Sequence, residues 1–347
     1  MRMTQLMGAA ALFALGLGVL SAGAQTAPAY AITPSAALGA PDRWDYLTFD
    51  AASHRVYIAH GDRISVIDAR SGAVLGAVLG MPGGTHGIGL SGGKGYTDDG
   101  KAGEVVVFDP ASFKVLKRIP ALPDADGITV DPTTGHVFVV DGDSAALTVI
   151  DPAVDTAIAT IKAGGGLEFA VAGPNGKVYV NGAENKELLR IDTATNTIDA
   201  RWPVPGCVSP HGLALDAAGH RLFTTCVNQV MVVVNTDTGA VVATLPIGRG
   251  TDAAGFDPVR KLAFSANGEG TITVVQETTP DSFSVLGAVK TQATGRTMTL
   301  DPATGRLYIA AAEVDTTAPV VPGPNGRPGR APMIPGSLKV LMLDPAQ

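Results

Sequence analysis

Short apolar strands return along this chain at a nearly constant spacing, and one strand of each unit shows the pattern best. That strand ends in an acid or an amide, and its seven copies end at Asp68, Asp109, Asp151, Asp192, Asn235, Gln276 and Asp344. The first five spacings between these residues are 41, 42, 41, 43 and 41 positions, and the sixth is 68 because an insertion interrupts the last unit. A period of about forty with several short strands per unit is typical of a β-propeller or a solenoid.

Each unit divides into four strands, which we name a to d in chain order, so that the strand just described is strand c. Strand b carries an aromatic residue in six of the seven units, with Ala263 as the exception: Tyr57, Tyr96, Phe138, Tyr179, Phe223 and Tyr308. Residues 55–58 and 177–180 alternate polar and apolar side chains, which favours half-buried strands. The turns between strands a and b, as in residues 131–135 and 301–305, contain Pro and then Gly, which suit tight turns.

The seventh unit ends just after its strand c and lacks a strand d of its own. Residues 32–39 near the start of the chain resemble residues 73–80, which form strand d of the first unit. Pairing this N-terminal strand into the last unit would close a ring and cover an exposed sheet edge. We therefore expect an all-β fold, a single seven-bladed β-propeller over residues 25–347. Each blade should have four antiparallel strands, and the N-terminal strand should close the last one.

The first residues of the chain have the features of a secretory signal. Arg2 provides a positive start, residues 6–20 are an apolar run, and residues 22–24 are Ala-Gly-Ala. This pattern predicts a signal peptide over residues 1–24, cleaved after Ala24. The apolar run is too short to span a bilayer comfortably, and no second such run follows. We expect an exported chain, periplasmic or secreted, with no membrane span after cleavage.

The charge balance limits the classes of partner. The chain has 32 acidic residues against 25 Lys and Arg, for a formal net charge of −7, and no run of basic residues. Neutralising a phosphate backbone requires clustered Lys and Arg, so the composition argues against nucleic-acid binding. The remaining partners are a small molecule or an envelope protein, and we expect a monomer.

The repeat also invites a family comparison. Its consensus, Pro-x-Gly-hydrophobic-Ala-x-Asp, then Gly-x-x-Tyr-Val, then Val-x-Val-Ile-Asp-x-x-Thr, resembles the YVTN-type repeats of YncE-like bacterial periplasmic propellers. The resemblance covers nearly all of the expected mature chain and implies the WD40/YVTN propeller fold. It implies no single function, because proteins with such repeats include lactonases, a lyase, redox-enzyme subunits and binding proteins. It also implies a Pro-Gly joint before the last strand, here residues 334–337.

In a propeller, strand a runs nearest the axis, so residues at its start surround one mouth of the central channel. Aligning the units places Leu167 at this position in the fourth, with Glu168 one place further along. With Glu168 taken for that unit, the predicted ligand-binding residues, here called the mouth ring, are Asp45, His86, Asp126, Glu168, His211, Asp252 and Arg296. The ends of strand b should add His60, Asp99 and Asp141 to the same face, whereas His54, His136 and His220 fall in turns on the opposite face.

The mouth ring admits several interpretations. As a binding module, the channel mouth would take a small molecule, a metal ion or a protein. A divalent metal ion would use His86, His211, Asp126 and Asp252, since imidazoles and carboxylates are common ligands. As a lactonase-like hydrolase or a lyase, the chain would use His86 or His211 as general base and Arg296 to stabilise an oxyanion. A hydrated mouth with no special role is the remaining alternative.

Two further features lie near the mouth. Cys207 and Cys226 fall at ends of neighbouring strands of the fifth unit, which in an oxidising compartment predicts a disulfide. The alternative is a Cys-His metal or redox site. The insertion over residues 313–336 is rich in Pro and Gly and should emerge on the mouth face. It is either a surface loop or a lid or partner contact that carries Arg327 and Arg330, with Arg306 nearby in the same unit.

Overall fold

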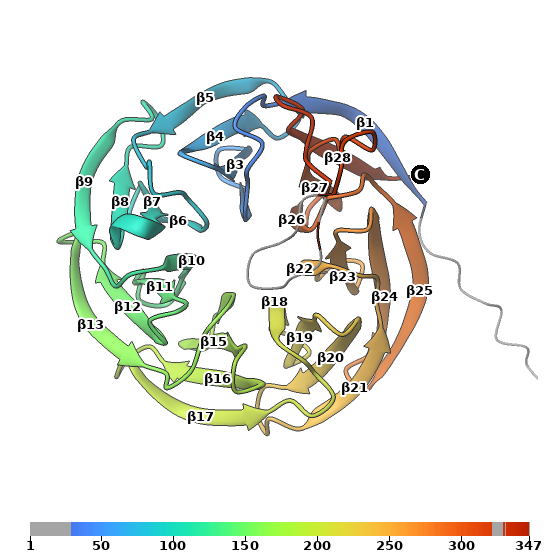
Figure 1. Ribbon diagram of the computed structural model, residues 1–347. Coiled ribbons are helices and arrows are strands. Elements are labelled where there is room, and N and C mark those ends of the chain that lie inside the picture. Colours follow the sequence, from blue (N-terminus) through green and yellow to red (C-terminus); the bar gives the residue numbers. More distant parts are fainter. Residues whose placement is uncertain (1–28, 321–328, 330, 347) are drawn as a thin grey trace, which may run out of the picture.

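Seven antiparallel sheets surround a central axis and form a seven-bladed β-propeller (Figure 1). The structure is a computed structural model that describes residues 29–320, 329 and 331–346. Each sheet has four strands, as the sequence repeat predicted. The predicted signal peptide over residues 1–24 and the two insertion arginines, Arg327 and Arg330, lie outside the described residues.

Strand bounds follow the repeat in every blade. The first three blades are β2 Leu47–Asp50, β3 Arg55–His60, β4 Arg63–Asp68 and β5 Val74–Leu79; β6 Ile88–Ser91, β7 Lys94–Asp99, β8 Glu104–Phe108 and β9 Val115–Pro120; β10 Ala125–Val130, β11 Val137–Asp141, β12 Ala146–Asp151 and β13 Thr156–Lys162. The next three are β14 Ala170–Gly173, β15 Lys177–Gly182, β16 Glu187–Asp192 and β17 Thr197–Pro203; β18 Pro210–Asp216, β19 Arg221–Cys226, β20 Val230–Asn235 and β21 Val241–Pro246; β22 Thr251–Asp257, β23 Leu262–Asn267, β24 Thr271–Thr279 and β25 Ser282–Lys290. The seventh is β26 Thr297–Asp301, β27 Arg306–Ala311, β28 Lys339–Pro345 and β1 Tyr30–Ala37, and a short 3₁₀ turn, η1 Gly100–Ala102, joins β7 to β8.

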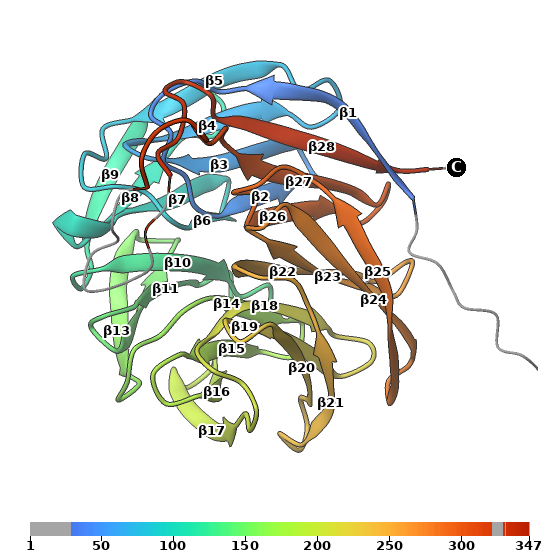
Figure 2. The same cartoon turned by 45° about the vertical axis from the view of Figure 1, so that its right-hand side comes forward.

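The last blade is closed by the N-terminal strand, as predicted. β1 pairs antiparallel with β28, with Ile32 opposite Leu343 and Ala37 opposite Lys339. The strand order of this sheet is β1-β28-β27-β26, so the outermost strand comes from the start of the chain (Figure 2). A ring closed in this way leaves no blade without its fourth strand.

The core lies between the blades rather than on one face of each sheet. The six strand-b aromatics are at most 1% exposed. Burial in these strands is nearly continuous, as in β3, where every residue after Arg55 is buried. The prediction of half-buried, alternating strands was therefore wrong for strand b, because neighbouring blades pack against both faces of each sheet.

The acid that ends strand c stabilises the turn into strand d. In the first blade, the Asp68 carboxylate accepts hydrogen bonds from the backbone N–H groups of Arg70 and Ser71 and from the Ser71 hydroxyl. This Asx-type turn needs a short acceptor side chain at one fixed position, and it recurs at Asp109, Asp151, Asp192 and Asn235. The feature that revealed the fold is thus a structural one.

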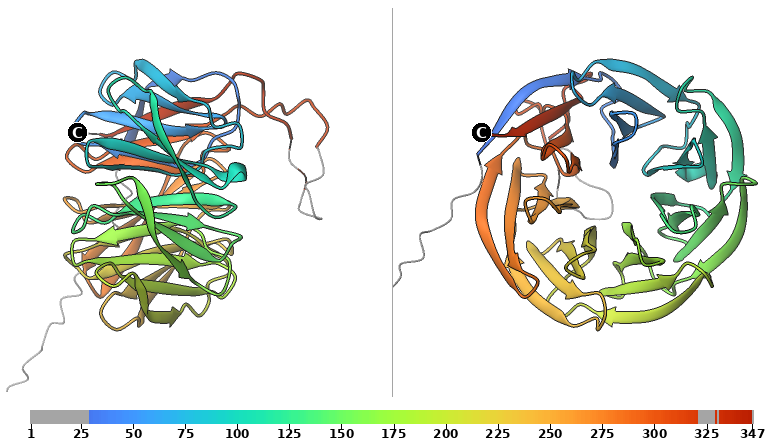
Figure 3. Two further views of the ribbon diagram at one scale, coloured as in Figure 1. Left: turned by 90° about the vertical axis from the view of Figure 1, so that its left-hand side faces the viewer. Right: turned by 180° about the vertical axis from the view of Figure 1, so that it is seen from behind.

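The described residues of the insertion in the last blade project from one face of the disc, the face that also carries η1 (Figure 3). Val314 and Met333 form an isolated antiparallel bridge near its base. Arg306 does not lie near it: its guanidinium pairs with Asp344 at 2.6 Å, at the far end of β27, so the expected neighbourhood was wrong. Within the described residues, no helix is long and apolar enough to cross a bilayer.

Candidate functional site: the channel mouth

Hydrogen bonding between strands a and b decides which residue of each blade belongs to the mouth ring. In the first blade, Asp45 N donates to Ala59 O and Ala59 N donates to Tyr46 O. The fourth blade repeats this pattern, with Glu168 N donating to Asn181 O and Asn181 N donating to the carbonyl oxygen of Phe169. Glu168 is therefore the structural equivalent of Asp45. The alignment of Leu167 with the ring was wrong by one position, and its side chain is buried in the apolar core.

The seven side chains of the mouth ring converge on the channel. The electrostatic neighbours of Asp45 show this directly, because they come from four other blades. Burial raises the pKa of Asp45 well above its usual value, and Asp252 and Asp126 raise it further, while Arg296 and His86 oppose the shift. The ring is thus one electrostatic unit, although its members are about forty residues apart in sequence.

Arg296 is paired within the ring. Its Nε donates to Asp252 Oδ2 at 2.5 Å, and its guanidinium carbon lies 5.7 Å from the centre of the Trp44 ring. Burial opposes the charge of Arg296, but Asp252 and Asp45 raise its pKa above the usual value. The charge of this arginine is therefore held in place by a neighbouring carboxylate and an aromatic face.

His86 is paired with a buried acid that the sequence did not single out. His86 Nδ1 lies 2.7 Å from Asp98 Oδ2, and Asp98 Oδ1 accepts the backbone N–H groups of His86 and Gly87 at 2.8 Å each. Burial alone would lower the pKa of His86, but the hydrogen bond to Asp98 raises it to about 9. Burial raises the pKa of Asp98, against the opposing effect of His86. We favour the ion pair at neutral pH, because three hydrogen bonds to the Asp98 carboxylate offset the cost of its burial.

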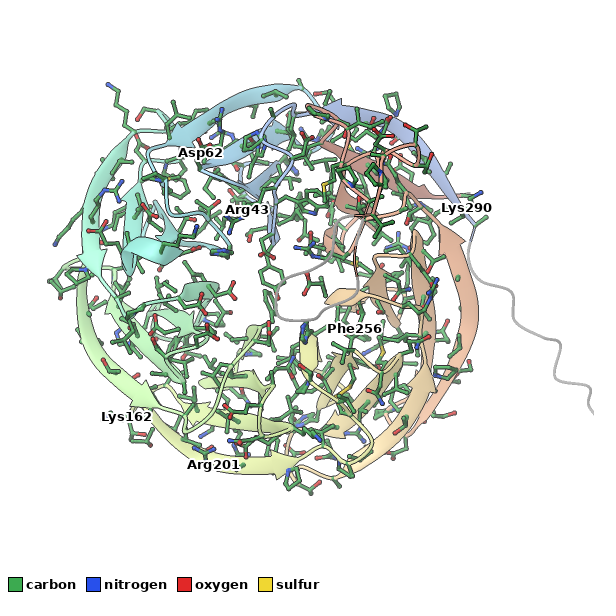
Figure 4. All side chains as sticks on the ribbon, viewed as in Figure 1. Arg43, Asp62, Lys162, Arg201, Phe256 and Lys290 are labelled. Atoms are coloured by element: carbon green, nitrogen blue, oxygen red, sulfur yellow. A yellow bond between two sulfur atoms is a disulfide. The ribbon has the colours of Figure 1, made fainter. Side chains whose placement is uncertain are left out.

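The outer nitrogen of this imidazole faces the mouth. Arg43, labelled in Figure 4 at the inner end of the first blade, has Nη2 3.5 Å from His86 Nε2. Sequence reasoning chose Asp99, the last residue of β7, in place of Asp98. The useful signal was the run of two acids at the end of one strand, because successive side chains on a strand point to opposite faces.

Three ring carboxyls, Asp45, Asp126 and Glu168, carry raised pKa values. Burial, with help from surrounding carboxylates, raises the pKa of Asp126 to about 7 and that of Glu168 to about 8. Within the described residues, Asp45 and Asp126 form no ion pair, and Glu168 has only the imidazole of His211, 3.7 Å away. Asp126 Oδ1 is buried without a hydrogen-bond partner. The ring therefore holds more acid than its own cations neutralise.

Two aromatic rings lie across the channel beneath these carboxyls. Tyr46 and Phe169 come from blades one and four, and their ring centroids are 4.4 Å apart. We call this pair the aromatic floor. The residues just after the ring positions are small in the other blades, which makes room for it: Gly87, Gly127, Gly212, Ala253 and Thr297. The sequence did contain a signal for this floor, because two aromatic residues stand among small residues at the position that follows the ring.

Beyond the aromatic floor the channel continues as a cavity of about 670 Å³, lined by the first strand of all seven blades. A second cavity of about 400 Å³ lies on the mouth side, between blades six and seven and the base of the insertion. Its lining includes Arg249, Arg296, Val314 and Met333. The insertion therefore emerges at the mouth, as predicted, with its described residues beside Arg296.

The candidate metal ligands are not assembled. Among the residues that the structure describes, no three His, Cys, Asp or Glu side chains are grouped so that they could hold a metal ion. His86 is engaged by Asp98 and Asp252 by Arg296, while His211 Nδ1 faces the Ser209 carbonyl at 3.0 Å. The structure thus does not support the predicted set of His86, His211, Asp126 and Asp252.

The other predicted mouth residues have structural roles. His60 is buried and bonds Ser65 Oγ at 2.8 Å and Pro41 O at 2.7 Å. Asp141 accepts a hydrogen bond from Thr148 at 2.8 Å. Asp99 is buried beside η1, with its Oδ2 3.5 Å from Arg118 Nη1. Among the described residues, Oδ1 of Asp99 and Oδ1 of Asp141 have no hydrogen-bond partner.

The cysteine and turn-histidine predictions agree with the structure. Cys207 and Cys226 form a disulfide with a Cα–Cα distance of 5.5 Å, so neither thiol is available for a Cys-His site. His220 lies in the turn between β18 and β19, where Nδ1 is 3.0 Å from Asp237 Oδ1. The disulfide fastens the segment that leads into His211.

Comparisons with known proteins show the fold alone. No protein-family model matches the chain, and no curated protein matches it. A solved structure of hydrazine synthase from Kuenenia stuttgartiensis is similar, with a TM-score of 0.67 at 16% identity over 76% of this chain and 91% of that one. A structure of U3-55K has a TM-score of 0.73 at 10% identity, over 90% of this chain and 98% of that one. At these identities the likeness shows a propeller and carries no function.

Proposed function

We propose that this chain is an exported propeller of the YVTN/YncE-like type that binds a small ligand at its channel mouth. The observation that carries the proposal is the convergence of Asp45, Asp126 and Glu168, carboxyls whose ionisation the ring by itself disfavours. Buried polar groups without partners cost folding free energy, so a fold that keeps them invites a ligand that satisfies them. A concave mouth with convergent polar groups is also where ligands bind most often.

The test is a ligand screen on the mature chain that begins at Gln25. We expect members of a library of small cations, anions and neutral polar compounds to raise the melting temperature of the wild type. The double variant Asp126→Asn/Glu168→Gln should lose that rise, because it keeps the shape of the ring and removes two of its ionisable carboxyls. Asp237→Asn, which removes one charge on the opposite face, is the matched control and should respond like the wild type. Identical responses of all three proteins to every compound would contradict the proposal.

Export is a separate part of the proposal, and the leader pattern of residues 1–24 supports it. Expression of the full chain in a Gram-negative host should place the protein in the periplasmic fraction, with Gln25 as its first residue. Replacing residues 6–20 with a polar sequence should keep it in the cytoplasm, because the translocation machinery reads the apolar run. A wild-type chain retained in the cytoplasm with Met1 intact would contradict this part.

One observation favours a hydrolase or a lyase as a second candidate. The buried Asp98 orients His86 so that Nε2 faces the mouth, beside carboxyls that titrate near neutrality, which is an arrangement suited to proton transfer. If the chain turns over lactones or esters, His86→Ala and Arg296→Ala should abolish activity. Asp98→Asn should shift the pH–rate profile by changing the pKa of His86. Turnover that survives His86→Ala would exclude this arrangement.

A further inference from the structure

The mouth ring combines an uncompensated acidic cluster with aromatic faces directly below it. We infer that the ligand is a small organic cation, a protonated amine, with its charge among Asp45, Asp126 and Glu168 and its apolar part against the rings of Tyr46 and Phe169. This inference rests on the proposed binding function and adds the chemical class of the ligand.

The charges of the mouth ring favour a cation as the ligand. The two cations of the ring are already engaged, Arg296 by Asp252 at 2.5 Å and His86 by Asp98 at 2.7 Å. Three further carboxyls lie close enough together to disfavour one another's ionised forms. A cation placed among them relieves this repulsion, whereas an anion would add to it.

The second step is the chemistry of the floor. The rings of Tyr46 and Phe169 meet at 4.4 Å beneath the carboxyls, with an interplanar angle of 45°. An ammonium group near an aromatic face is attracted by the ring quadrupole, and its alkyl substituents pack against the same surface. Carboxylates above and aromatic faces below are complementary to an alkylammonium ion in both charge and polarity.

The third observation concerns polar groups at the site. Asp126 Oδ1 is buried and has no hydrogen-bond partner among the described residues, and Tyr46 is only 6% exposed. After burial, the four groups that raise the pKa of Tyr46 are carboxyls of the ring: Asp252, Asp45, Glu168 and Asp126. The hydroxyl therefore faces the centre of the ring. Its oxygen can accept a hydrogen bond from an ammonium N–H while its ring supports the alkyl part.

The fourth step separates an organic cation from a metal ion. A divalent metal needs several ligand atoms at about 2.0–2.6 Å from one point, and no group of three suitable side chains in the described part of the chain provides this. An alkylammonium ion spreads its contacts over a larger volume and accepts longer distances. A ring of carboxyls held apart by blade geometry therefore suits an organic cation better.

Binding should strengthen as the ring ionises. The titratable and charged groups around the site are Arg43, Asp45, Tyr46, His86, Asp98, Asp124, Asp126, Asp143, Glu168, His211, Asp252 and Arg296. The pKa values of about 7 for Asp126 and about 8 for Glu168 lie within the accessible range. An alkylamine stays protonated below a pH of about 10. Its affinity should therefore rise at least tenfold between pH 6 and pH 8.5, with release of protons on binding.

Calorimetric titration of the mature chain with n-butylammonium at pH 8 tests the inference. Butyrate and n-butanol serve as an anion and a neutral molecule of similar size, and both should bind at least tenfold more weakly. Glu168→Gln and Asp126→Asn should each weaken butylammonium binding about tenfold, while Asp237→Asn on the opposite face should leave it unchanged. Tyr46→Phe keeps the ring and should cost only a few-fold, and Tyr46→Leu, which removes the aromatic face, should cost more. Circular dichroism of each variant checks that it is folded.

The outcomes distinguish a failure of the cation inference from a failure of the binding proposal. If butyrate or butanol binds best and the ring variants abolish that binding, the mouth is a binding site but the cation inference is wrong. If butylammonium binds equally well to the wild type, the ring variants and the control, it is attracted non-specifically to an acidic protein, and the inference is again wrong. If no compound of the larger screen distinguishes the wild type from the ring double variant, the binding proposal and the inference fail together.

Discussion

At the scale of the residue, the ring carboxyls are held in surroundings that favour their protonated forms. The clearest case is Glu168. Burial and nearby carboxylates raise the pKa of its carboxyl from 4.5 to about 8. A carboxyl with a raised pKa in the folded state stabilises the fold at low pH, and the stabilisation is lost as the pH rises toward that pKa. In Glu168 this loss falls between about pH 4.5 and pH 8.

This leads to a prediction for Glu168→Gln. The free energy of unfolding of the wild type should fall between pH 5 and pH 8, and the variant should lose less by about 1–3 kcal/mol, because its amide does not ionise. Urea denaturation at both pH values measures the difference. Glu313→Gln, which neutralises an exposed glutamate at the base of the insertion, is the control and should follow the wild type. If the free energy of unfolding changes equally with pH in Glu168→Gln and in the wild type, the pKa of Glu168 is not raised in the folded chain.

Sequence reasoning identified ring positions better than it identified partners. The repeat placed six members of the mouth ring at their correct positions and Glu168 one place away, because a period of forty aligns blades to within a residue. It could not show that Asp98 rather than Asp99 faces His86, since that depends on the pleat of β7 in its final register. Contacts between blades, such as that of Tyr46 with Phe169, have no signal in a single unit.

At the scale of the element, the disulfide joins the segment before β18 to the end of β19. Cys207 and Cys226 are 19 residues apart, and both are buried. In the chain-entropy account, closing such a loop limits the unfolded state and stabilises the fold. The same bond holds the entrance to the strand that carries His211.

We therefore predict that the double variant Cys207→Ala/Cys226→Ala loses about 3 kcal/mol of unfolding free energy. Denaturant unfolding of the wild type, with and without a reductant, provides the comparison. The reduced wild type should approach the variant, and the two should unfold with similar midpoints. A variant as stable as the oxidised wild type would mean that the bond contributes no net stability.

Strand type followed directly from the sequence, but strand environment did not. The strand-b aromatics and the acid at the end of strand c were read correctly as parts of a repeat. Half-burial was inferred from alternation in residues 55–58 and 177–180, yet residues 56–58 and 178–180 are buried. An isolated strand pattern describes a sheet with one covered face, whereas a propeller blade is covered on both by its neighbours.

At the scale of the whole molecule, stability depends on closing the ring with β1. This strand joins the two ends of the chain in one sheet and covers the outer edge of β28. Removing it would expose an unpaired edge strand and part of the apolar packing of the seventh blade. Ala36, on β1, is part of that packing.

We predict that a chain starting at Leu38 has a melting temperature at least 10 °C below that of the mature chain and associates through the exposed edge of β28. Size-exclusion chromatography and thermal denaturation measure the two effects. A chain starting at Ala29, which keeps all of β1, is the matched control and should behave like the mature chain. A monomeric chain from Leu38 with unchanged melting would contradict the role assigned to β1.

The sequence by itself determined the number of blades, the strand that closes them, the pairing of the two cysteines and the set of positions that meet at one mouth of the channel. These follow from a repeat, because each copy of a local pattern folds in the same way and its spacing orders the copies in space. Only the tertiary structure decided which carboxyls remain without a cation, that Asp98 holds His86, and that Tyr46 and Phe169 form a floor beneath them. The contact of Asp98 with His86 forms within one blade and depends on the final register of β7, whereas the floor and the ring carboxyls meet between blades. The pattern within one repeat contains no information about contacts between blades.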